Sequence, residues 1–272
     1  MKKLKTSLII TTYNWPEALF LVLKSIKHQS IPPDEIIVAD DGSNDDTKNI
    51  IRKFSKNFKL EIIHSWQKDE GFRAAMSRNK AIAKARGEYI IMIDGDMILH
   101  PDFIKDHTSF AKSNSFVQGM RAKLSEEKSN DIMKTKNIIF KNFDKGLKSK
   151  RYGIHNSLLS YLCSGIRRIN KLNMLQTCNM AFYKKDALRI NGFNEDFIGW
   201  GREDSEFGAR MLNAKIVRKD LRFSAVAYHI HHEGNSREML DYNHQIYLNT
   251  LNKKLVRCKN GINKYIVKTS TE

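Results

Sequence analysis

The first hundred residues alternate between short apolar runs and amphipathic segments. Apolar runs typical of buried strands occupy residues 7–11, 35–39, 60–63 and 88–93. The spacing of apolar residues and the capping signals predict helices over residues 16–29, from 44 or 45 onward, and 72–86. Such alternation with short connections predicts an α/β fold, with a Rossmann-like, mostly parallel sheet flanked by helices.

Polar residues occupy the ends of three of these predicted strands. They form the segments Thr11-Thr12-Tyr13-Asn14, Asp40-Asp41-Gly42-Ser43 and Asp94-Gly95-Asp96. Each of the acidic segments, taken alone, could be only a turn or a helix cap. However, ligands of such sheets bind at the carboxyl ends of the strands, and carboxylates are preferred ligands of Mg²⁺ and Mn²⁺. The three segments together therefore predict a binding site with a divalent cation.

The pattern is looser beyond Pro101, where we expect one compact unit to continue into a second half. Helices are predicted over residues 102–112 and 202–213, and strands over 115–120, 175–183 and 224–230. We expect four parts: a nucleotide-sugar-binding half over residues 1–120, a basic helical insertion over 121–172, an acceptor-binding and catalytic half over 173–235, and a basic C-terminal tail over 236–272.

An aromatic residue between two glycines precedes a cluster of carboxylates in the segment from Gly199 to Glu206. Glu203, Asp204 and Glu206 could simply complement a helix dipole, and Trp200 could be a core residue. Flanking glycines also allow a flat ring to approach a ligand closely, which favours sugar stacking by Trp200. A cation site for a pyrophosphate, a carboxylate base and a stacking surface together indicate glycosyl transfer from a nucleotide sugar.

The segment His229-Ile230-His231-His232 gives a weaker signal, because histidines are common at exposed strand ends. A carboxylate site that selects Mn²⁺ often gains one imidazole ligand. His229 and His231 would point to the same side of a strand, so we expect His229 to bind the metal, with His231 as the alternative.

The net charge of +17 calls for an anionic partner or a solvated surface. Many of the cations lie between Arg121 and Lys171, interleaved with Leu158, Leu159, Tyr161 and Ile166. This mixture is consistent with an exposed face, an anionic membrane surface or an acidic acceptor. Strand-end carboxylates would repel phosphates in the absence of a metal, which argues against nucleic acid as the partner.

Cysteine usage and hydropathy indicate the compartment. Three widely spaced cysteines, Cys163, Cys178 and Cys258, are typical of buried thiols in a reducing environment. The first apolar run is too short for a signal peptide, and no run approaches the length of a membrane span. We expect a cytoplasmic protein, with peripheral binding to the inner face of the cell membrane as a further expectation.

The ordered motifs resemble those of the family 2 glycosyltransferases of the GT-A fold. The three strand-end segments carry this resemblance, together with Gly71-Phe72-Arg73 and Ser77-Arg78-Asn79-Lys80-Ala81. The later Gly192-Phe193-Asn194-Glu195 and the segment from Gly199 to Asp204 resemble the acceptor half of chondroitin-polymerase-type and β-1,4-galactosyltransferase-type enzymes. Trp15 departs from the family pattern, in which an arginine often follows Tyr-Asn, and the basic insertion lies outside the resemblance.

The resemblance implies a role for each matching residue. Six residues would contact the UDP-sugar donor. Thr11, Tyr13 and Asp41 would bind uracil and ribose, and Arg78 would contact the nucleotide. Asp94 would lie by the ribose and sugar, and Asn179 would contact the donor sugar. Asp96 and His229 would bind Mn²⁺, or Mg²⁺ in its place. Asp204 would be the general base, Glu203 would orient the acceptor, and Trp200 would form the wall of the acceptor pocket.

The activity implied is inverting, metal-dependent transfer of a sugar of the Gal, GalNAc, Glc or GlcNAc type. A UDP-sugar would be the donor, and a hydroxyl of a capsular, lipopolysaccharide-like or lipid-linked cell-surface glycan the acceptor. Two other classes remain as alternatives: a nucleic-acid-binding protein, which the charge alone would favour, and a catalytically inactive glycan-binding protein with the same fold.

Overall fold

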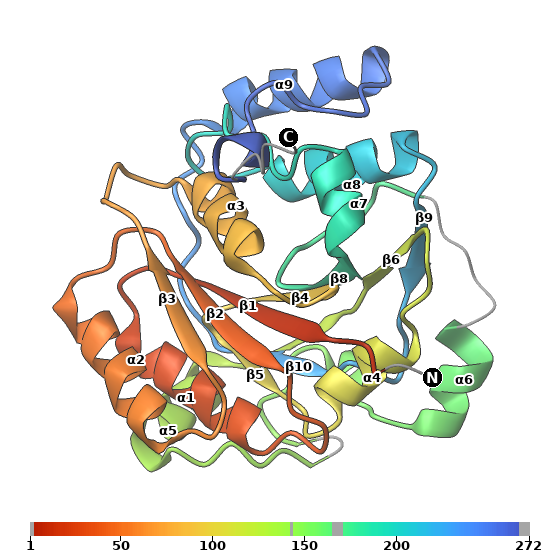
Figure 1. The fold of residues 1–272 in the computed structure, drawn as a ribbon. Coiled ribbons are helices and arrows are strands. Elements are labelled where there is room, and N and C mark those ends of the chain that lie inside the picture. Colours follow the sequence, from red (N-terminus) through yellow and green to blue (C-terminus); the bar gives the residue numbers. More distant parts are fainter. Residues whose placement is uncertain (1–2, 142–143, 165–170, 267–272) are drawn as a thin grey trace.

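A central seven-stranded sheet organises the molecule (Figure 1). The computed structural model describes residues 3–141, 144–164 and 171–266. In spatial order the strands are β3 (Ile62–Trp66), β2 (Glu35–Asp40), β1 (Thr6–Thr12), β4 (Tyr89–Asp94), β8 (Asn179–Tyr183), β6 (Ser115–Gln118) and β9 (Val217–Asp220).

The register of this sheet agrees with the predicted mostly parallel arrangement. β1 pairs in parallel with both β2 and β4, so that Thr11 lies beside Ala39 on one side and Asp94 on the other. β8 is antiparallel to β4 and to β6, while β9 is parallel to β6. The ends of β1, β2 and β4 therefore meet at one edge of the sheet, as the polar segments predicted.

Helices cover both faces of the sheet (Figure 1). One face packs against α1 (Pro16–Lys27), α2 (Asp45–Asn57) and α4 (Phe103–Ser109), and the other against α3 (Ala74–Lys84), α7 (Lys184–Arg189) and α8 (Glu203–Asn213). The inner strands are buried on both faces, which explains their continuous apolar runs.

A small second sheet extends the site edge of the molecule. Its order is β5 (Met97–Leu99), β10 (Ala227–His229) and β7 (Arg121–Lys123), and it sets His229 opposite Met97, the neighbour of Asp96. These strands have three residues each, which is too short for a pattern of alternating apolar residues to identify them in the sequence. The strand predicted over residues 224–230 is observed only as β10 and is shorter than expected.

Part of the basic insertion packs against this small second sheet. α5 (Glu126–Thr135) buries Ile132 against the small sheet, followed by the 3₁₀ turn η1 (Lys150–Tyr152) and α6 (Ser157–Ser164). Ile166, Arg167 and Arg168, which belong to the predicted basic surface, lie outside the described residues.

The basic C-terminal segment contains a helix, α9 (Leu240–Asn252), which packs on α8, and a 3₁₀ turn, η2 (Ile262–Lys264). Asn243 of α9 is buried and donates to the carbonyl oxygens of Ile198 and Trp200, so this helix supports the Trp200 loop. Among the helices of the described residues, none combines the length and apolar character needed to cross a lipid bilayer.

Candidate active site

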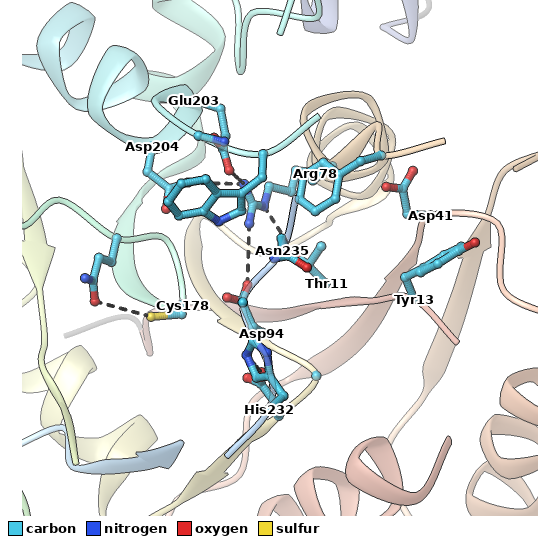
Figure 2. A pocket seen from close by; sticks show the side chains of 18 of the residues that line it. Thr11, Tyr13, Asp41, Arg78, Asp94, Cys178, Glu203, Asp204, His232 and Asn235 are labelled. Carbon is cyan, nitrogen blue, oxygen red and sulfur yellow. Dashed lines mark hydrogen bonds and ion pairs between the residues drawn. The ribbon is translucent and has the colours of Figure 1, made fainter. Parts of the chain in front are cut away.

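A cavity of about 870 Å³ opens at the carboxyl ends of β1 and β4 and reaches the start of α8 (Figure 2). Ten of the eleven residues predicted for the site line it: Thr11, Tyr13, Asp41, Arg78, Asp94, Asp96, Trp200, Glu203, Asp204 and His229. Residues more than two hundred positions apart in the sequence, such as Thr11 and His229, are thus brought into one cavity.

Asp41 and Tyr13 form one end of the cavity. The Asp41 carboxylate accepts hydrogen bonds from the Gln67 side chain (2.7 Å) and from the backbone N–H of Arg73 (2.8 Å). Burial raises the pKa of Asp41 to about 6, although both hydrogen bonds and the charge of Arg78 act in the opposite direction. The Tyr13 ring is 50% exposed, with its hydroxyl donating to Asp69 at 2.9 Å, so a flat face is free for stacking.

The neighbouring Asp40 has a structural role. It is fully buried, accepts from the backbone N–H of Ser43 at 2.8 Å and lies 2.7 Å from His64 Nε2. Asp40 therefore stabilises the turn that presents Asp41. Of the two aspartates in this segment, Asp40 has the turn-forming role that the sequence left open as an alternative.

Arg78 is the central cation of the site. Its guanidinium donates to Asp204 (3.2 Å), Asp94 (3.4 Å) and the hydroxyl of Thr11 (3.3 Å), and lies 3.7 Å from Glu203. Burial disfavours this charge, but the three carboxylates outweigh that effect and raise the pKa of Arg78. Arg78 therefore ties the strand ends of the first half to the first turn of α8 in the second.

The turn after β4 brings the chain close to β1. The backbone N–H of Gly95 donates to the carbonyl of Thr11 at 2.7 Å, and a Cβ at Gly95 would lie 2.8 Å from the Thr12 hydroxyl oxygen. A larger residue would push this turn outward, which explains a glycine between the two aspartates. Burial raises the pKa of Asp94 to about 6, against the effect of Arg78.

Three side chains could together hold a metal ion. Asp96 Oδ2 lies 3.4 Å from His229 Nε2 and 3.2 Å from His232 Nε2. The other carboxylate oxygen of Asp96 is buried without a hydrogen-bond partner among the described residues. Burial lowers the pKa of His229 to about 4, which keeps the imidazole neutral, as a metal ligand must be. This donor set fits Mn²⁺ or another divalent cation with mixed oxygen and nitrogen ligands.

The alternative ligand His231 does not join this group. β10 ends at His229, so the alternation of a strand no longer applies two residues later, and His231 does not line the cavity. His232 takes the position beside Asp96 instead, and its ring lies 5.9 Å from that of Trp15. His232 belongs to the same sequence motif, but a strand that continued through it would point its side chain away from the side of His229.

Trp200 also lines the cavity, in a loop that needs both of its glycines. Gly199 and Gly201 have φ values of 71° and 115°, where a side chain would be strained. The Trp200 ring is partly exposed, and the Arg237 guanidinium lies 5.8 Å from its centroid. The loop thus presents an aromatic face beside a cation.

Glu203 and Asp204 occupy the first turn of α8 but differ in environment. Glu203 is buried and accepts from the backbone N–H of Gly201 at 3.1 Å. Burial, reinforced by Asp204, raises the pKa of Glu203 to about 7. Asp204 accepts from the backbone N–H of Thr177 (3.0 Å) and its hydroxyl (2.7 Å), besides Arg78. Both carboxylates therefore make specific contacts, which two surface residues that only complement a helix dipole would not need.

The predicted donor-sugar contact of Asn179 is not supported by its position. Asn179 is 1% exposed and does not line the cavity. Its amide donates to the carbonyls of Met120 and Ala225 and its oxygen lies 2.8 Å from His107 Nε2. The residue fills the space over Gly119 and joins three segments of the core, a role that its local sequence does not reveal.

Sequence reasoning missed several other residues in and behind the cavity. Thr177 is buried behind the lining and holds Asp204, because the chain turns before β8 instead of continuing the predicted strand from residue 175. Four cations line the wall without having been predicted, and they are Arg121, Lys123, Arg202 and Arg237. A search for charged residues near the glycine loop and the histidine motif would have found the last two.

Comparison with known families agrees with these features. The model of glycosyl transferase family 2 matches residues 7–188, and that of the N-terminal domain of galactosyltransferase matches residues 163–233. The second match covers the Trp200 loop and the first turn of α8. The resemblance indicated by the motifs is confirmed in both halves.

Curated relatives match over most of this chain. Chondroitin synthase of Escherichia coli is 27% identical over 246 residues, which cover 85% of this chain and 35% of the relative. Hyaluronan synthase of Pasteurella multocida is 28% identical over 259 residues, covering 85% of this chain and 25% of the relative. The chain therefore spans about a quarter to a third of the length of these two relatives.

Solved structures agree in fold. TarS 1-349 of S. aureus, in complex with UDP, has a TM-score of 0.63 at 18% identity and covers 96% of this chain and 68% of that one. The mannosyltransferase PcManGT of Pyrobaculum calidifontis, in complex with GDP-Man and Mn²⁺, has a TM-score of 0.60 at 16% identity, covering 96% and 66%. The predicted GT-A fold is confirmed.

Proposed function

Because the chain belongs to glycosyl transferase family 2, we propose that it moves a hexose from a UDP-sugar to a hydroxyl of a cell-surface glycan. We propose inversion at the anomeric carbon and dependence on Mn²⁺ or Mg²⁺. The observation that carries this proposal is one cavity that contains an Asp41–Tyr13 pocket, the Asp96–His229–His232 group and the carboxylates of α8.

The Asp41 end of the cavity suits the nucleoside. The Asp41 carboxylate can accept the N3–H of uracil, a donor that cytosine lacks, and the exposed Tyr13 face can stack on the base. Thr11 and Asp94 lie next to Arg78, where they can meet the ribose and the sugar. The solved complex of TarS with UDP, in a protein of the same fold, supports this donor class.

Asp96, His229 and His232 are the residues that would hold the cation. When bound, Mn²⁺ or Mg²⁺ neutralises negative charge on the departing diphosphate. Arg121 and Lys123 lie on the strand beside His229 and can contact the same phosphates. Their positive charges would also favour entry of a UDP-sugar into a cavity with five acidic side chains.

The acceptor would bind in the part of the cavity lined by Trp200, Glu203 and Asp204. Asp204 takes the proton of the acceptor hydroxyl as the oxygen attacks the anomeric carbon from the face opposite UDP. The new carbon–oxygen bond forms while the bond to the phosphate oxygen breaks, and UDP leaves with that electron pair. Glu203 orients the acceptor hydroxyl, and Trp200 provides the stacking face.

Arg78 would couple the two events. It contacts Asp94 on the donor side and Asp204 on the acceptor side, so a donor that engages the guanidinium can release Asp204 for proton transfer. We assign Arg78 a positioning role in addition to its contact with the nucleotide.

The relatives support a glycan as acceptor, since two of them are named chondroitin synthase and hyaluronan synthase. We propose a capsular, lipopolysaccharide-like or lipid-linked glycan, with the enzyme bound peripherally to the inner face of the cell membrane. The high net positive charge is consistent with an anionic surface or acceptor.

Screening UDP-sugars for hydrolysis with and without Mn²⁺ tests the proposal. We expect one or a few UDP-hexoses to be hydrolysed only with metal, and hydrolysis to be lost in Asp96→Asn. Binding of UDP without any hydrolysis or transfer would instead indicate an inactive glycan-binding protein. A salt-dependent shift of DNA, with no thermal stabilisation by UDP and Mn²⁺, would indicate the nucleic-acid alternative.

A further inference from the structure

Helix α6 is docked with its polar side inward. Ser160 and Ser164, four residues apart on one face, are 2% and 1% exposed. Leu158 and Tyr161, on the outer side, are 69% and 76% exposed, and Leu159 and Leu162 are exposed as well. A surface helix of a globular protein normally buries its apolar face, so this arrangement is inverted.

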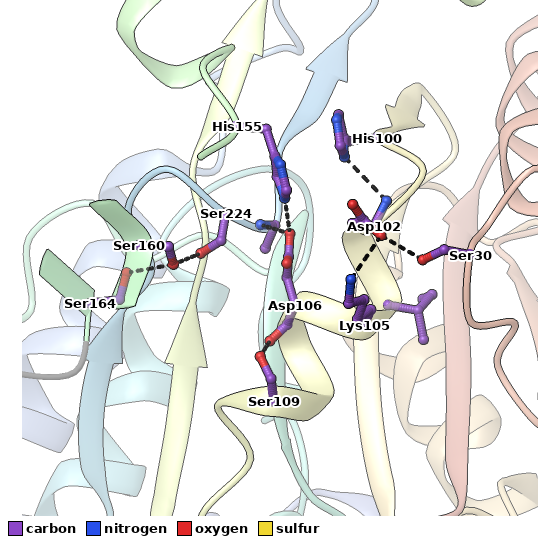
Figure 3. A network of polar contacts seen from close by, with 12 residues as sticks. Ser30, His100, Asp102, Lys105, Asp106, Ser109, His155, Ser160, Ser164 and Ser224 are labelled. Atoms are coloured by element: carbon purple, nitrogen blue, oxygen red, sulfur yellow. Dashed lines mark hydrogen bonds and ion pairs between the residues drawn. The ribbon is translucent and has the colours of Figure 1, made fainter. Parts of the chain in front are cut away.

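Hydrogen bonds fix the helix in this orientation (Figure 3). Ser160 donates to the hydroxyl of Ser224 at 2.7 Å. Ser164 donates to the carbonyl of Arg222 (3.0 Å) and accepts from its backbone N–H (2.7 Å). Rolling the helix to bury its leucines would leave these buried polar groups without partners, at a cost in free energy for each.

The segment before α6 is anchored as well. His155 Nε2 lies 2.9 Å from Asp106 Oδ2 on α4, and the same oxygen accepts the backbone N–H of Ala225 at 2.7 Å (Figure 3). The backbone N–H of Asn156 donates to the carbonyl of Phe223 at 2.9 Å. Both ends of α6 are therefore attached to the strand-connecting segment at 222–225, and its outer face is presented in a fixed position.

The stretch of sequence that contains α6 carries charges of one sign. Between Lys145 and Lys171 the sequence has seven lysine or arginine residues and no aspartate or glutamate. Arg222, whose backbone binds Ser164, is exposed. Apolar and aromatic side chains flanked in sequence by cations are the combination expected of an element that lies in the headgroup region of an anionic bilayer.

We propose that the face of α6 formed by Leu158, Leu159, Tyr161 and Leu162 inserts into the headgroup region of a membrane rich in anionic lipid. α6 would be the element that carries the membrane association of the proposed function, and only the biological purpose of this association rests on that function. A second copy of the chain fits the surface less well. A two-fold contact through α6 would bring two acid-free, cation-rich segments together.

The test replaces Leu158 and Tyr161 with glutamine in the full chain. Cosedimentation is measured with phosphatidylcholine vesicles, with and without phosphatidylglycerol. We expect the wild type to bind the anionic vesicles, and the double variant to bind at least about tenfold more weakly, because two apolar side chains no longer insert. Both residues are exposed, so the fold should be retained, which circular dichroism and UDP-induced thermal stabilisation would verify.

Tyr242→Gln is the matched control. Tyr242 is 52% exposed on α9, which lies at the top of the molecule in Figure 1, far from α6 at the lower right. Its replacement should leave vesicle binding unchanged, which separates an effect of α6 from a general loss of exposed aromatic surface. Equal losses in the control and in the double variant would contradict a specific role for α6.

Two further results would overturn the inference. One is absence of binding of the wild type to anionic vesicles at low salt. The other is a dimer in sedimentation velocity that the double variant dissociates, which would assign the face to a second copy. If the wild type binds anionic vesicles but does not hydrolyse any UDP-sugar in the presence of metal, the proposed function alone is refuted. The two failures can therefore be distinguished.

Discussion

Replacing Glu203 with glutamine should stabilise the folded protein at alkaline pH and impair sugar transfer. In the folded protein, burial and the neighbouring Asp204 raise the pKa of Glu203 from an ordinary 4.5 to about 7. The folded state thus binds a proton at this site more tightly than the unfolded state. The stability associated with that proton is present below pH 4.5 and is lost as pH rises through 7.

The magnitude follows from that difference in pKa. At about 1.36 kcal/mol per pH unit, ionisation of Glu203 costs up to about 3 kcal/mol of folding free energy above pH 8. Glutamine does not ionise, and its carbonyl oxygen can still accept the N–H of Gly201. Glu203→Gln should therefore gain about 3 kcal/mol above pH 8, but less than about 0.5 kcal/mol at pH 4.5.

Urea denaturation of the wild type and the variant across this pH range measures the effect. The exposed Glu238 offers a control, and Glu238→Gln should change stability by less than about 0.5 kcal/mol at either pH. A gain for Glu203→Gln that does not depend on pH, or a loss of stability at pH 8, would refute the reasoning. Transfer to an acceptor should fall in the same variant, while UDP binding should be retained.

Other predictions concern the donor side. Asp41→Asn should weaken UDP binding about tenfold or more in calorimetry, through loss of a charge-assisted hydrogen bond, and should abolish the preference for UDP over CDP. Wild-type affinity for UDP should decline as pH falls below about 6, where Asp41 becomes protonated; an unchanged affinity would place the uracil contact elsewhere. His232→Ala should reduce Mn²⁺ affinity about tenfold or more, whereas His231→Ala should not; the reverse order would restore His231 as a ligand. Arg78→Gln should reduce transfer at least about a hundredfold, since it leaves the buried Glu203 and two partly buried carboxylates without their cation; full activity would contradict its positioning role.

The parts of the fold that could be predicted from sequence depend on local pattern. β1, β2 and β4 are buried on both faces, so their apolar runs and the polar residues after them were recognisable. The carboxyl ends of neighbouring parallel strands must meet, which is why Asp41 and Asp94 could be expected at one edge. Both inferences could be made without knowledge of contacts between distant segments.

The remaining features depend on contacts between distant segments. Arg78 meets Asp204 across 126 positions, and Asn179 is drawn into the core by His107 and Ala225. His232 reaches Asp96 because β10 ends earlier than the histidine pattern suggested. The inward serines of α6 find their partners in residues 222–224, so the sequence could suggest a basic, partly apolar surface but not which side of the helix faces outward.

Calorimetric titration of UDP into the wild type and Asp96→Ala, each with Mn²⁺ and with a chelator, tests the central claim most directly. We expect Mn²⁺ to strengthen UDP binding to the wild type by at least about tenfold, because a cation held by Asp96 would offset the negative charge of the diphosphate. The variant should bind UDP equally with and without metal, through the intact nucleoside pocket. Metal-independent UDP binding in the wild type, or an undiminished effect of Mn²⁺ in Asp96→Ala, would contradict the account.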